Sequence, residues 1–188
     1  MEQKYSNHRI QEDLKKGTKM KYIFFWGHQP SKDGIMTKTC FSQWWMTSFI
    51  INGETYCCME QYMMAEKARL FNDAETLKWI MESNNPKQIK DWGRKVKNFN
   101  EELWEQRRYS IVFNDNYAKF SQNESLTQFL INTKDSVLVE ASPYDKVWGI
   151  GMSAEDEHLE NPLLWKGLNL LGFALMEVRD ELMNACNA

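Results

Sequence analysis

Residues 58–71 read CMEQYMMAEKARLF, and this stretch predicts an α-helix whose apolar face also carries charge. With about 3.6 residues per turn, one face collects five side chains in the spacing of a core-facing helix: Glu60, Met63, Met64, Lys67 and Phe71. An unpaired carboxylate or ammonium group is costly to bury, so the two charged side chains should have partners, water or a ligand. We therefore treat this face as a candidate site.

The sequence around this helix predicts an α+β fold with more helix than strand. Residues 49–56 hold Asn52-Gly53 between apolar runs, which is a strong signal for a β-hairpin near 49–57. β-Branched and aromatic residues predict further strands at 22–26 and 136–141. Capping residues and apolar periodicity predict the remaining helices, which are 73–82, 86–96, 100–120, 124–132 and a last one from Asn161-Pro162 to Leu182.

Length and composition favour one domain in the cytoplasm. The 188 residues contain no long linker-like tract, so we expect an N-terminal arm or short helix at 1–20 and a single domain at 21–188. The opening residues resemble neither a signal peptide nor a transit peptide, and no apolar run is long enough to predict a membrane span. A net charge of -3 argues against coating nucleic acid through bulk electrostatics.

No sequence motif requires a metal or a nicotinamide cofactor. The chain has no G-x-G-x-x-G, Walker, H-E-x-x-H or G-x-S-x-G motif. Its four cysteines have no C-x-x-C spacing and are expected to be reduced thiols rather than disulfides or nucleophiles: Cys40, Cys57, Cys58 and Cys186. We therefore predict no cofactor and no metal site.

Two other segments can carry chemistry. Residues 145–151, DKVWGIG, follow a predicted strand and combine a carboxylate, an indole and two glycines; the alternative interpretation is a tight turn with a packed tryptophan. Residues 87–108 are rich in lysine and arginine, with Trp92 and Trp104 interleaved. They suit binding of a phosphate and a base, although such a run of charges is more often a solvated helix face.

Glu60 and Asp145 are the carboxylates that we expect to act together. Glu60 lies in the first turn of its helix, where the helix dipole favours negative charge, so it can also be read as a simple helix-start residue. Lys67 can likewise be an ordinary surface lysine. A carboxylate pair with basic and aromatic neighbours fits hydrolysis through a cationic, sugar-like transition state better than redox or metal chemistry. On this hypothesis the 58–71 helix should face Asp145.

At the level of ordered motifs, the chain resembles the YbiA-like, or NADAR, family from about Phe24 to Leu182. The motifs that carry the resemblance are 41–44 (FSQW), 58–68 (CMEQYMMAEKA), 93–96 (GRKV), the helix with Trp104, 138–151 (LVEASPYDKVWGIG) and 167–172 (GLNLLG). The resemblance implies a single YbiA-like domain and a hydrolase that acts on N-glycosyl bonds.

The implied substrates are phosphorylated ribosylamino-pyrimidine intermediates of riboflavin biosynthesis, cleaved at ribose C1'–N to ribose 5-phosphate and the base. One alternative is removal of ADP-ribose from guanine in nucleic acid, and another is a non-catalytic module that binds NAD or ADP-ribose. The expected partner is thus a small phosphoriboside or an ADP-ribose conjugate, with nucleic acid only under the first alternative and no membrane. The oligomeric state is left open.

Residue by residue, the resemblance implies catalytic or substrate-holding roles for Glu60, Trp104, Asp145 and Trp148. It implies substrate-binding roles for Ser42, Lys67, Gly93, Arg94 and Gly149. Asp145 is expected to stabilise the sugar cation or activate water, and Glu60 to serve as a second acid or base; the two roles can be exchanged. Two motifs depart from the family pattern beside the expected pocket. In the helix, Gln61 stands in place of histidine and Met63-Met64 in place of Phe-Gln, and in the 41–44 motif Gln43 stands in place of asparagine.

Overall fold

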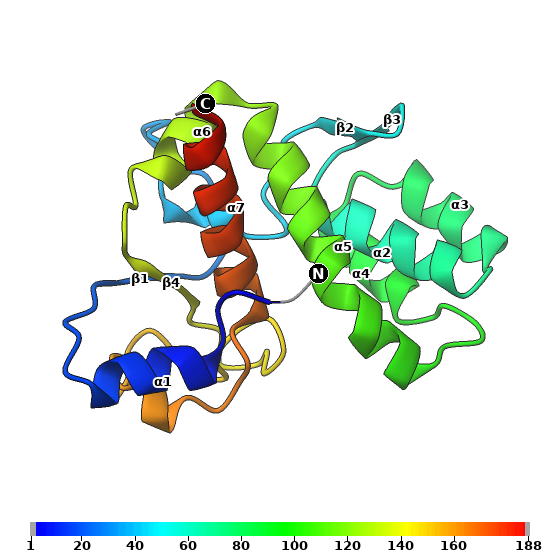
Figure 1. The fold of residues 1–188 in the computed structure, drawn as a ribbon. Coiled ribbons are helices and arrows are strands. Elements are labelled where there is room, and N and C mark those ends of the chain that lie inside the picture. The colour runs from blue at the N-terminus through cyan, green and yellow to red at the C-terminus, as the bar shows by residue number, and fades with distance from the viewer. Residues whose placement is uncertain (1–2, 187–188) are drawn as a thin grey trace. The chain divides into compact units, whose positions relative to one another are not determined.

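A computed structural model describes residues 3–186, with the side chain of Cys186 outside the described part. The chain divides into two compact units. Unit 1 combines residues 1–42 with 124–188, and unit 2 comprises residues 43–123. Figure 1 shows the elements of both, and each unit is described by itself.

Unit 1 is built on a short parallel sheet. Strand β1 (Tyr22–Phe25) pairs in parallel with β4 (Val137–Glu140), so that both strands end at the same edge. The apolar run that opens β4 is buried, as expected for a parallel strand covered by helices. Helix α7 (Leu170–Cys186) packs against β4, and α6 (Glu124–Ile131) packs against α7.

The N-terminal residues form a helix that is attached to unit 1. Helix α1 (Asn7–Lys15) is capped by Ser6, and the Asn7 amide donates to the Gly167 carbonyl at 2.8 Å. Short 3₁₀ turns follow at η1 (Lys38–Phe41) and η2 (Pro162–Leu164). An arm or a short helix was expected at 1–20, and the structure contains a short helix there.

The predicted start of the last helix is wrong. Asn161 caps only η2, and α7 begins at Leu170. Between η2 and α7, backbone N–H groups donate to carbonyls of the 145–151 loop instead of to carbonyls four residues earlier. Examples are Leu168 N–H to Lys146 O at 2.9 Å and Asn169 N–H to Gly149 O at 3.1 Å. Long-range pairing therefore replaces the i to i−4 ladder. Leu168 fits the helical spacing but is 46% exposed.

Unit 2 begins with the predicted hairpin. Strands β2 (Phe49–Ile51) and β3 (Glu54–Tyr56) pair antiparallel, with Ile51 opposite Glu54. Asn52 and Gly53 both have positive φ, 52° and 82°, which is the requirement of a type I′ turn. The hairpin leads directly into α2 (Met59–Leu70).

Helix α2 is the centre of unit 2. It packs against α3 (Ala74–Glu82), α4 (Pro86–Gly93) and α5 (Glu101–Ser121). The predicted caps are present, with side-chain oxygens of Asp73, Asn85 and Asn100 accepting backbone N–H bonds. The expectation of one buried face was too narrow, because Gln61, Tyr62 and Ala65 on the other faces of α2 are buried as well.

Helix α4 ends at Gly93 rather than at Val96, where it was predicted to end. The Gly93 carbonyl accepts a bond from Lys67 Nζ at 2.9 Å, and Lys95 N–H turns back to the Trp92 carbonyl at 2.8 Å. The bond from Lys67 therefore occupies the Gly93 carbonyl, which a further turn of α4 would need as an acceptor. The helix-rich α+β fold class and the hairpin are confirmed.

Candidate active site

Glu60 is buried at the start of α2, with 2% of its surface exposed. The indole Nε1 of Trp44 donates to Glu60 Oε2 at 3.1 Å. The backbone N–H of Glu60 donates to the Gln43 carbonyl at 3.0 Å. The segment before the hairpin therefore positions both the side chain and the backbone of Glu60. Trp44 in turn makes a cation–π contact with Lys90, whose Nζ lies 5.7 Å from the ring centroid.

Lys67 lies two turns along α2 in an aromatic setting. Besides its bond to Gly93, the ammonium lies 4.4 Å from the centroid of Phe99 and 5.6 Å from that of Trp104. Burial lowers the pKa of Lys67, and the negative charge of Glu60 opposes that shift. Unit 2 thus brings together four of the predicted site residues, Glu60, Lys67, Gly93 and Trp104.

Gly93 and Arg94 behave differently although they are neighbours. A Cβ on Gly93 would lie 1.9 Å from Met64 Sδ, so the glycine permits α2 and α4 to approach closely. The Arg94 side chain is 69% exposed and pairs with Asp91 at 3.6 Å. Gly93 therefore belongs to the frame around Lys67, whereas Arg94 lies at the surface of unit 2.

The basic run at 87–108 has the character of a solvated helix surface. Several of its charges form exposed pairs with acidic neighbours one turn away or across a loop, as in Lys87 with Asp91 and Lys97 with Glu75. Arg108 differs, because its side chain is largely buried where it pairs with Glu105 at 3.2 Å. Lys95 instead lies 4.5 Å from the Trp92 ring centroid. The exposed pairs contribute little to stability, because solvent screens them.

A second buried carboxylate, Asp115 on α5, was missed by the sequence reasoning. Asp115 is fully buried, and one oxygen accepts the Asn116 amide at 2.9 Å while Oδ2 has no hydrogen-bond partner within the described residues. Burial raises the pKa of Asp115 well above its usual range, Lys119 opposes this, and Glu60 adds to it. The spacing of Asp115 and Lys119 on one buried helix face was the available signal.

The two departures from the family pattern have distinct environments. The Gln61 amide is occupied by backbone groups, accepting Cys57 N–H at 2.7 Å and donating to the Ser83 carbonyl at 3.0 Å. Gln43 is 6% exposed, and its Oε1 has no hydrogen-bond partner in the described part of the chain. Gln61 is therefore a structural residue, while Gln43 keeps a buried acceptor beside Glu60.

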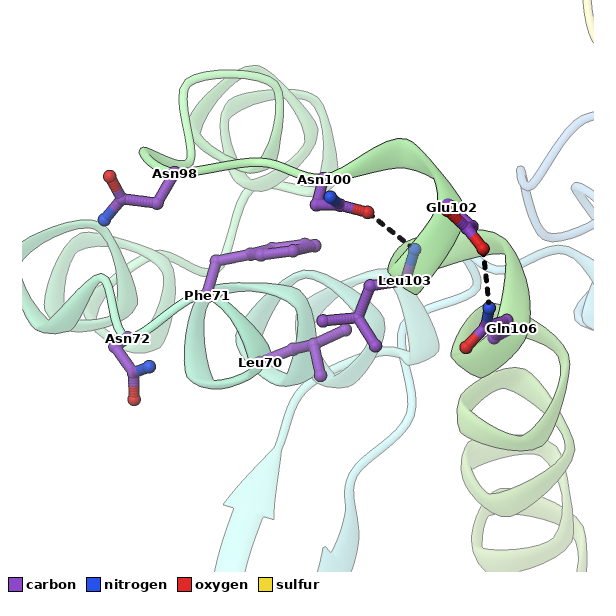
Figure 2. A pocket seen from close by; sticks show the side chains of 8 residues that line it. All are labelled: Leu70, Phe71, Asn72, Asn98, Asn100, Glu102, Leu103 and Gln106. Atoms are coloured by element: carbon purple, nitrogen blue, oxygen red, sulfur yellow. Dashed lines mark hydrogen bonds between the residues drawn. The ribbon is translucent and has the colours of Figure 1, made fainter.

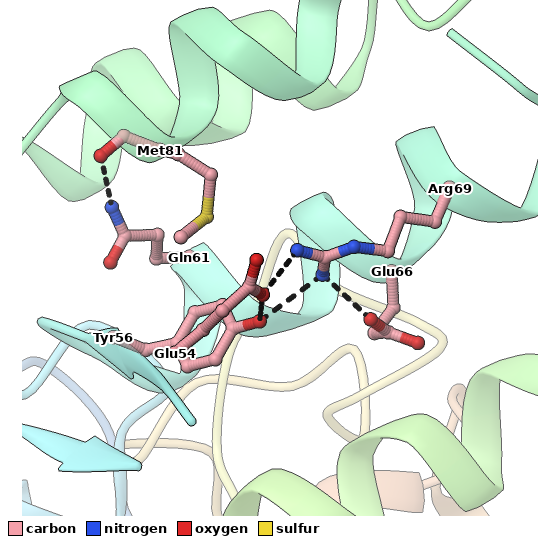
Figure 3. Close-up of polar contacts among 6 residues, drawn as sticks. All are labelled: Glu54, Tyr56, Gln61, Glu66, Arg69 and Met81. Atoms are coloured by element: carbon pink, nitrogen blue, oxygen red, sulfur yellow. Dashed lines mark hydrogen bonds and ion pairs between the residues drawn. The ribbon is translucent and has the colours of Figure 1, made fainter. Parts of the chain in front are cut away.

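Figure 3 shows how the hairpin is fastened to the far end of α2. The Arg69 guanidinium donates to the Tyr56 hydroxyl at 3.1 Å and to Glu66 at 2.8 Å, and it also pairs with Glu54. In the same view the Gln61 amide donates to the Met81 carbonyl at 3.4 Å. These contacts fix α2 along its length, so Glu60 lies on a rigid element.

In unit 1, Asp145 organises the loop that follows β4. Its Oδ1 accepts the backbone N–H groups of Val147 at 2.9 Å and Trp148 at 2.8 Å. Its own N–H donates to Ser142 Oγ at 3.2 Å. No residue in the described ranges hydrogen-bonds to the second oxygen, Oδ2. One half of this carboxylate is thus structural, and the other half is available to a ligand.

The end of β4 and residues 167–171 together hold this loop in place. A Cβ on Gly149 would lie 2.8 Å from the Glu140 carbonyl oxygen, and one on Gly167 would lie 2.3 Å from the Gly149 carbonyl oxygen. Asn169 is fully buried at φ 54°, donating to Leu138 O at 2.9 Å and accepting Glu140 N–H at 3.0 Å. Unit 1 thereby brings Asp145, Trp148 and Gly149 together on one loop.

The remaining predicted residue, Ser42, ends η1 and donates its backbone N–H to Thr39 O at 3.1 Å. Asn169, which the sequence reasoning placed inside a helix, is the residue of unit 1 whose role was missed. An asparagine within an apolar helical repeat was the signal, since asparagine favours caps and turns over helix interiors.

A cavity of about 400 Å³ lies elsewhere in unit 2 (Figure 2). It is lined by Leu70 and Phe71 from the end of α2 and by residues around the start of α5. Figure 2 shows the Asn100 oxygen bonded to Leu103 N–H, so this side chain is occupied as a helix cap. Phe71, at the end of the candidate face of α2, lines the cavity, but none of the residues with an implied catalytic or substrate-binding role does, so we do not assign the cavity to the reaction.

Among residues 3–186, side chains of His, Cys, Asp and Glu form no group of three or more that could hold a metal ion. No helix in that same stretch has the length and apolar character needed to cross a membrane.

Comparison with known proteins adds three relatives and a family. The NADAR domain model matches residues 24–183. N-glycosidase R617 of Acanthamoeba polyphaga mimivirus is 43% identical over 166 residues, covering 86% of this chain and 96% of that protein. The chloroplastic riboflavin biosynthesis protein PYRR of Zea mays is 32% identical over 146 residues, covering 73% of this chain but only 22% of that protein.

A solved structure has the same fold. The NMR structure of the E. coli protein YbiA superposes with a TM-score of 0.70 at 27% identity, covering 88% of this chain and 87% of that one.

Proposed function

This chain belongs to the NADAR domain family, and from that premise we propose that it hydrolyses the ribose C1'–N bond of phosphorylated ribosylamino-pyrimidines, intermediates of riboflavin biosynthesis. The products are ribose 5-phosphate and the free base. The general activity is that of an N-glycosidase, a hydrolase of N-glycosyl bonds. The choice of substrate draws support from the riboflavin biosynthesis protein of maize among the relatives.

The reaction requires a group that manages protons beside the breaking bond. As C1'–N breaks, the electron pair leaves with nitrogen and the ribose becomes oxocarbenium-like. Nitrogen needs a proton, and the incoming water must lose one. Glu60 suits this exchange because it lies on a rigid buried helix turn and is oriented by the Trp44 N–H.

Asp145 suits the complementary role of stabilising positive charge on the sugar. Its Oδ1 is fixed by two backbone N–H groups. Oδ2 then presents charge in a fixed direction. An anion held in place before the reaction starts stabilises a developing cation without rearrangement during the step.

The remaining site residues suit binding rather than bond breaking. Lys67 is a held cation that can neutralise a 5'-phosphate, with Arg94 contributing from the surface. Trp104 and Trp148 offer rings for the heterocycle. The backbone of the site is shaped by the remaining predicted substrate-binding residues, Ser42, Gly93 and Gly149. The buried Gln43 Oε1 can accept a hydrogen bond from an amino group of the substrate.

The observation that carries the proposal is the buried Glu60, bonded to an indole N–H and electrostatically coupled to Lys67. The test offers purified protein two substrates in parallel, a ribosylamino-pyrimidine 5'-phosphate and DNA that contains ADP-ribosylated guanine. We expect ribose 5-phosphate from the first, measured as free reducing sugar. Turnover of the ADP-ribosylated DNA alone would overturn the substrate assignment.

A further inference from the structure

Two adjacent thiols, Cys57 and Cys58, join the hairpin to α2. Their sulfur atoms lie 3.9 Å apart, and Cys57 Sγ also lies 3.9 Å from the Ser83 carbonyl oxygen. Cys57 is half-buried, whereas Cys58 is fully buried. The pair therefore combines a thiol that small reagents can reach with a second thiol in contact behind it.

The two thiols differ in acidity. The contact with Cys58 lowers the pKa of Cys57, while that contact, burial and the charge of Glu60 all raise the pKa of Cys58. Oxidation of cysteine follows thiolate character and exposure, and sensor cysteines commonly have a resolving cysteine beside them. Cys57 thus has the properties of the attacking sulfur and Cys58 those of the resolving one.

The surroundings favour sulfur chemistry over a metal site. Within the described residues, no third metal-binding side chain joins the pair to make a group of three. A structural zinc ion takes four protein ligands. Two sulfurs in contact are sufficient for a disulfide.

We propose that Cys57 and Cys58 form a modification site at which hydrogen peroxide converts the dithiol into a vicinal disulfide. The Cys57 thiolate attacks one peroxide oxygen, the O–O bond breaks, hydroxide leaves and the sulfur becomes a sulfenic acid. The Cys58 sulfur then attacks the Cys57 sulfur, and the S–OH oxygen leaves as water with the Cys58 proton. Two thiols and one peroxide thus give one disulfide and two waters.

Closing this ring changes the backbone that carries Glu60. The two sulfur atoms must approach from 3.9 Å to about 2.05 Å, while the adjacent Cα atoms stay only about 3.8 Å apart, closer than the roughly 4.4–6.8 Å of ordinary disulfides. Ring closure must therefore change the torsion angles on either side of the 57–58 peptide. The carbonyl of that peptide, Cys57 O, accepts Thr47 N–H at 3.0 Å, and the N–H of the preceding peptide, Cys57 N–H, donates to Gln61 Oε1 at 2.7 Å. Cys58 is also the N-cap of α2. Rotation therefore disturbs the first turn of α2, and the resulting loss of activity rests on the proposed role of Glu60.

The test reads the modification by mass, independently of activity. Reduced protein is treated with hydrogen peroxide, alkylated and digested after glutamate, which releases residues 55–60 with both cysteines. We expect this peptide to lose two hydrogens and to regain them with dithiothreitol, while the fully buried Cys40 stays reduced. Riboside hydrolysis, if present, should fall and recover in step.

Two variants make the outcome decisive. Cys58→Ser should fold, because serine is a favoured N-cap, and should stop at a sulfenic acid on Cys57 that dimedone traps. Cys57→Ser should remain unmodified at this peptide. The proposal is overturned if the wild-type peptide keeps both thiols under conditions that oxidise free glutathione, or if Cys57→Ser is oxidised as fast as wild type. Disulfide formation without any effect on hydrolysis would instead count against the role of Glu60.

Discussion

Glu60 and Asp145 are held by opposite means, although both are candidate carboxylates of one reaction. Glu60 lies in a buried helix turn and receives a side-chain N–H, whereas Asp145 lies in a half-buried loop and receives two backbone N–H groups. The Glu60 carboxylate is oriented by a neighbouring side chain, and the Asp145 carboxylate is oriented by the backbone of the turn that it closes. Substitutions should therefore affect Glu60 through other side chains and Asp145 through the loop itself.

The largest effect is expected from removing either charge. Glu60→Gln and Asp145→Asn should each lower kcat by at least about 10²-fold, the size typical of lost acid–base or electrostatic groups. Both replacements keep an oxygen acceptor, so circular dichroism should be unchanged. Steady-state kinetics on the phosphoriboside measure the effect.

Matched controls for these variants are Glu66→Gln on the same helix and Asp156→Asn, a loop carboxylate that accepts His158 N–H at 2.9 Å. Unchanged turnover in both Glu60→Gln and Asp145→Asn would refute the site. Asp145→Ala, which also removes the loop acceptor, should lower Tm where Asp145→Asn does not.

The next effect tests whether Glu60 depends on a neighbouring side chain. Trp44→Phe keeps the ring that faces Lys90 but removes the N–H donor to Glu60. A hydrogen bond to a charged group contributes about 1.5–3 kcal/mol, so kcat should fall about tenfold or more. Trp79→Phe, the same change on α3, should leave kcat unaltered. Equal kinetics in the two variants would show that the indole does not position Glu60.

A pH-dependent effect on stability is expected from Asp115. Because burial raises its pKa, the folded chain keeps a proton that the unfolded chain loses above about pH 4, so the free energy of unfolding falls as pH rises. The slope is at most about 1.4 kcal/mol per pH unit, and Asp115→Asn should remove it. Urea unfolding of both proteins between about pH 5 and 7 gives the comparison. A difference between them that does not vary with pH would contradict the raised pKa.

The smallest effect is expected at the surface. Arg94→Ala should raise KM about two- to threefold without changing kcat, because an exposed cation acts through screened attraction. Raising the salt concentration should reduce the difference. A loss of kcat would show that Arg94 acts on the bond that breaks.

Local signals predicted most of the fold. The Asn52-Gly53 turn, the caps at Asp73, Asn85 and Asn100 and the strand at 137–140 all follow from short-range chemistry. The failures involve long-range partners. Leucine spacing predicted helix through 161–169, but the backbone there bonds to a loop distant in sequence.

The residues of the candidate site were likewise predictable where the signal is local and not where it depends on long-range contacts. Glu60, Lys67, Gly93 and Trp104 were named from motif and helical phase, and unit 2 groups them. Trp44 and Asp115 were not assigned roles, because their importance depends on contacts that cross 16 residues of sequence or lie within a buried helix face. Such contacts leave little trace in spacing.

The pairing of residues 145–151 with 166–171 has a consequence for protein engineering. Five backbone hydrogen bonds tie these segments together, and Gly167 lies so close to the loop that a Cβ there would be 2.3 Å from the Gly149 carbonyl oxygen. If the 145–151 loop alone were replaced by that of a relative to alter substrate preference, it would lose the 166–171 segment to which it hydrogen-bonds. Chimaeras within this family should therefore take residues 145–151 and residues 166–171 from the same parent protein.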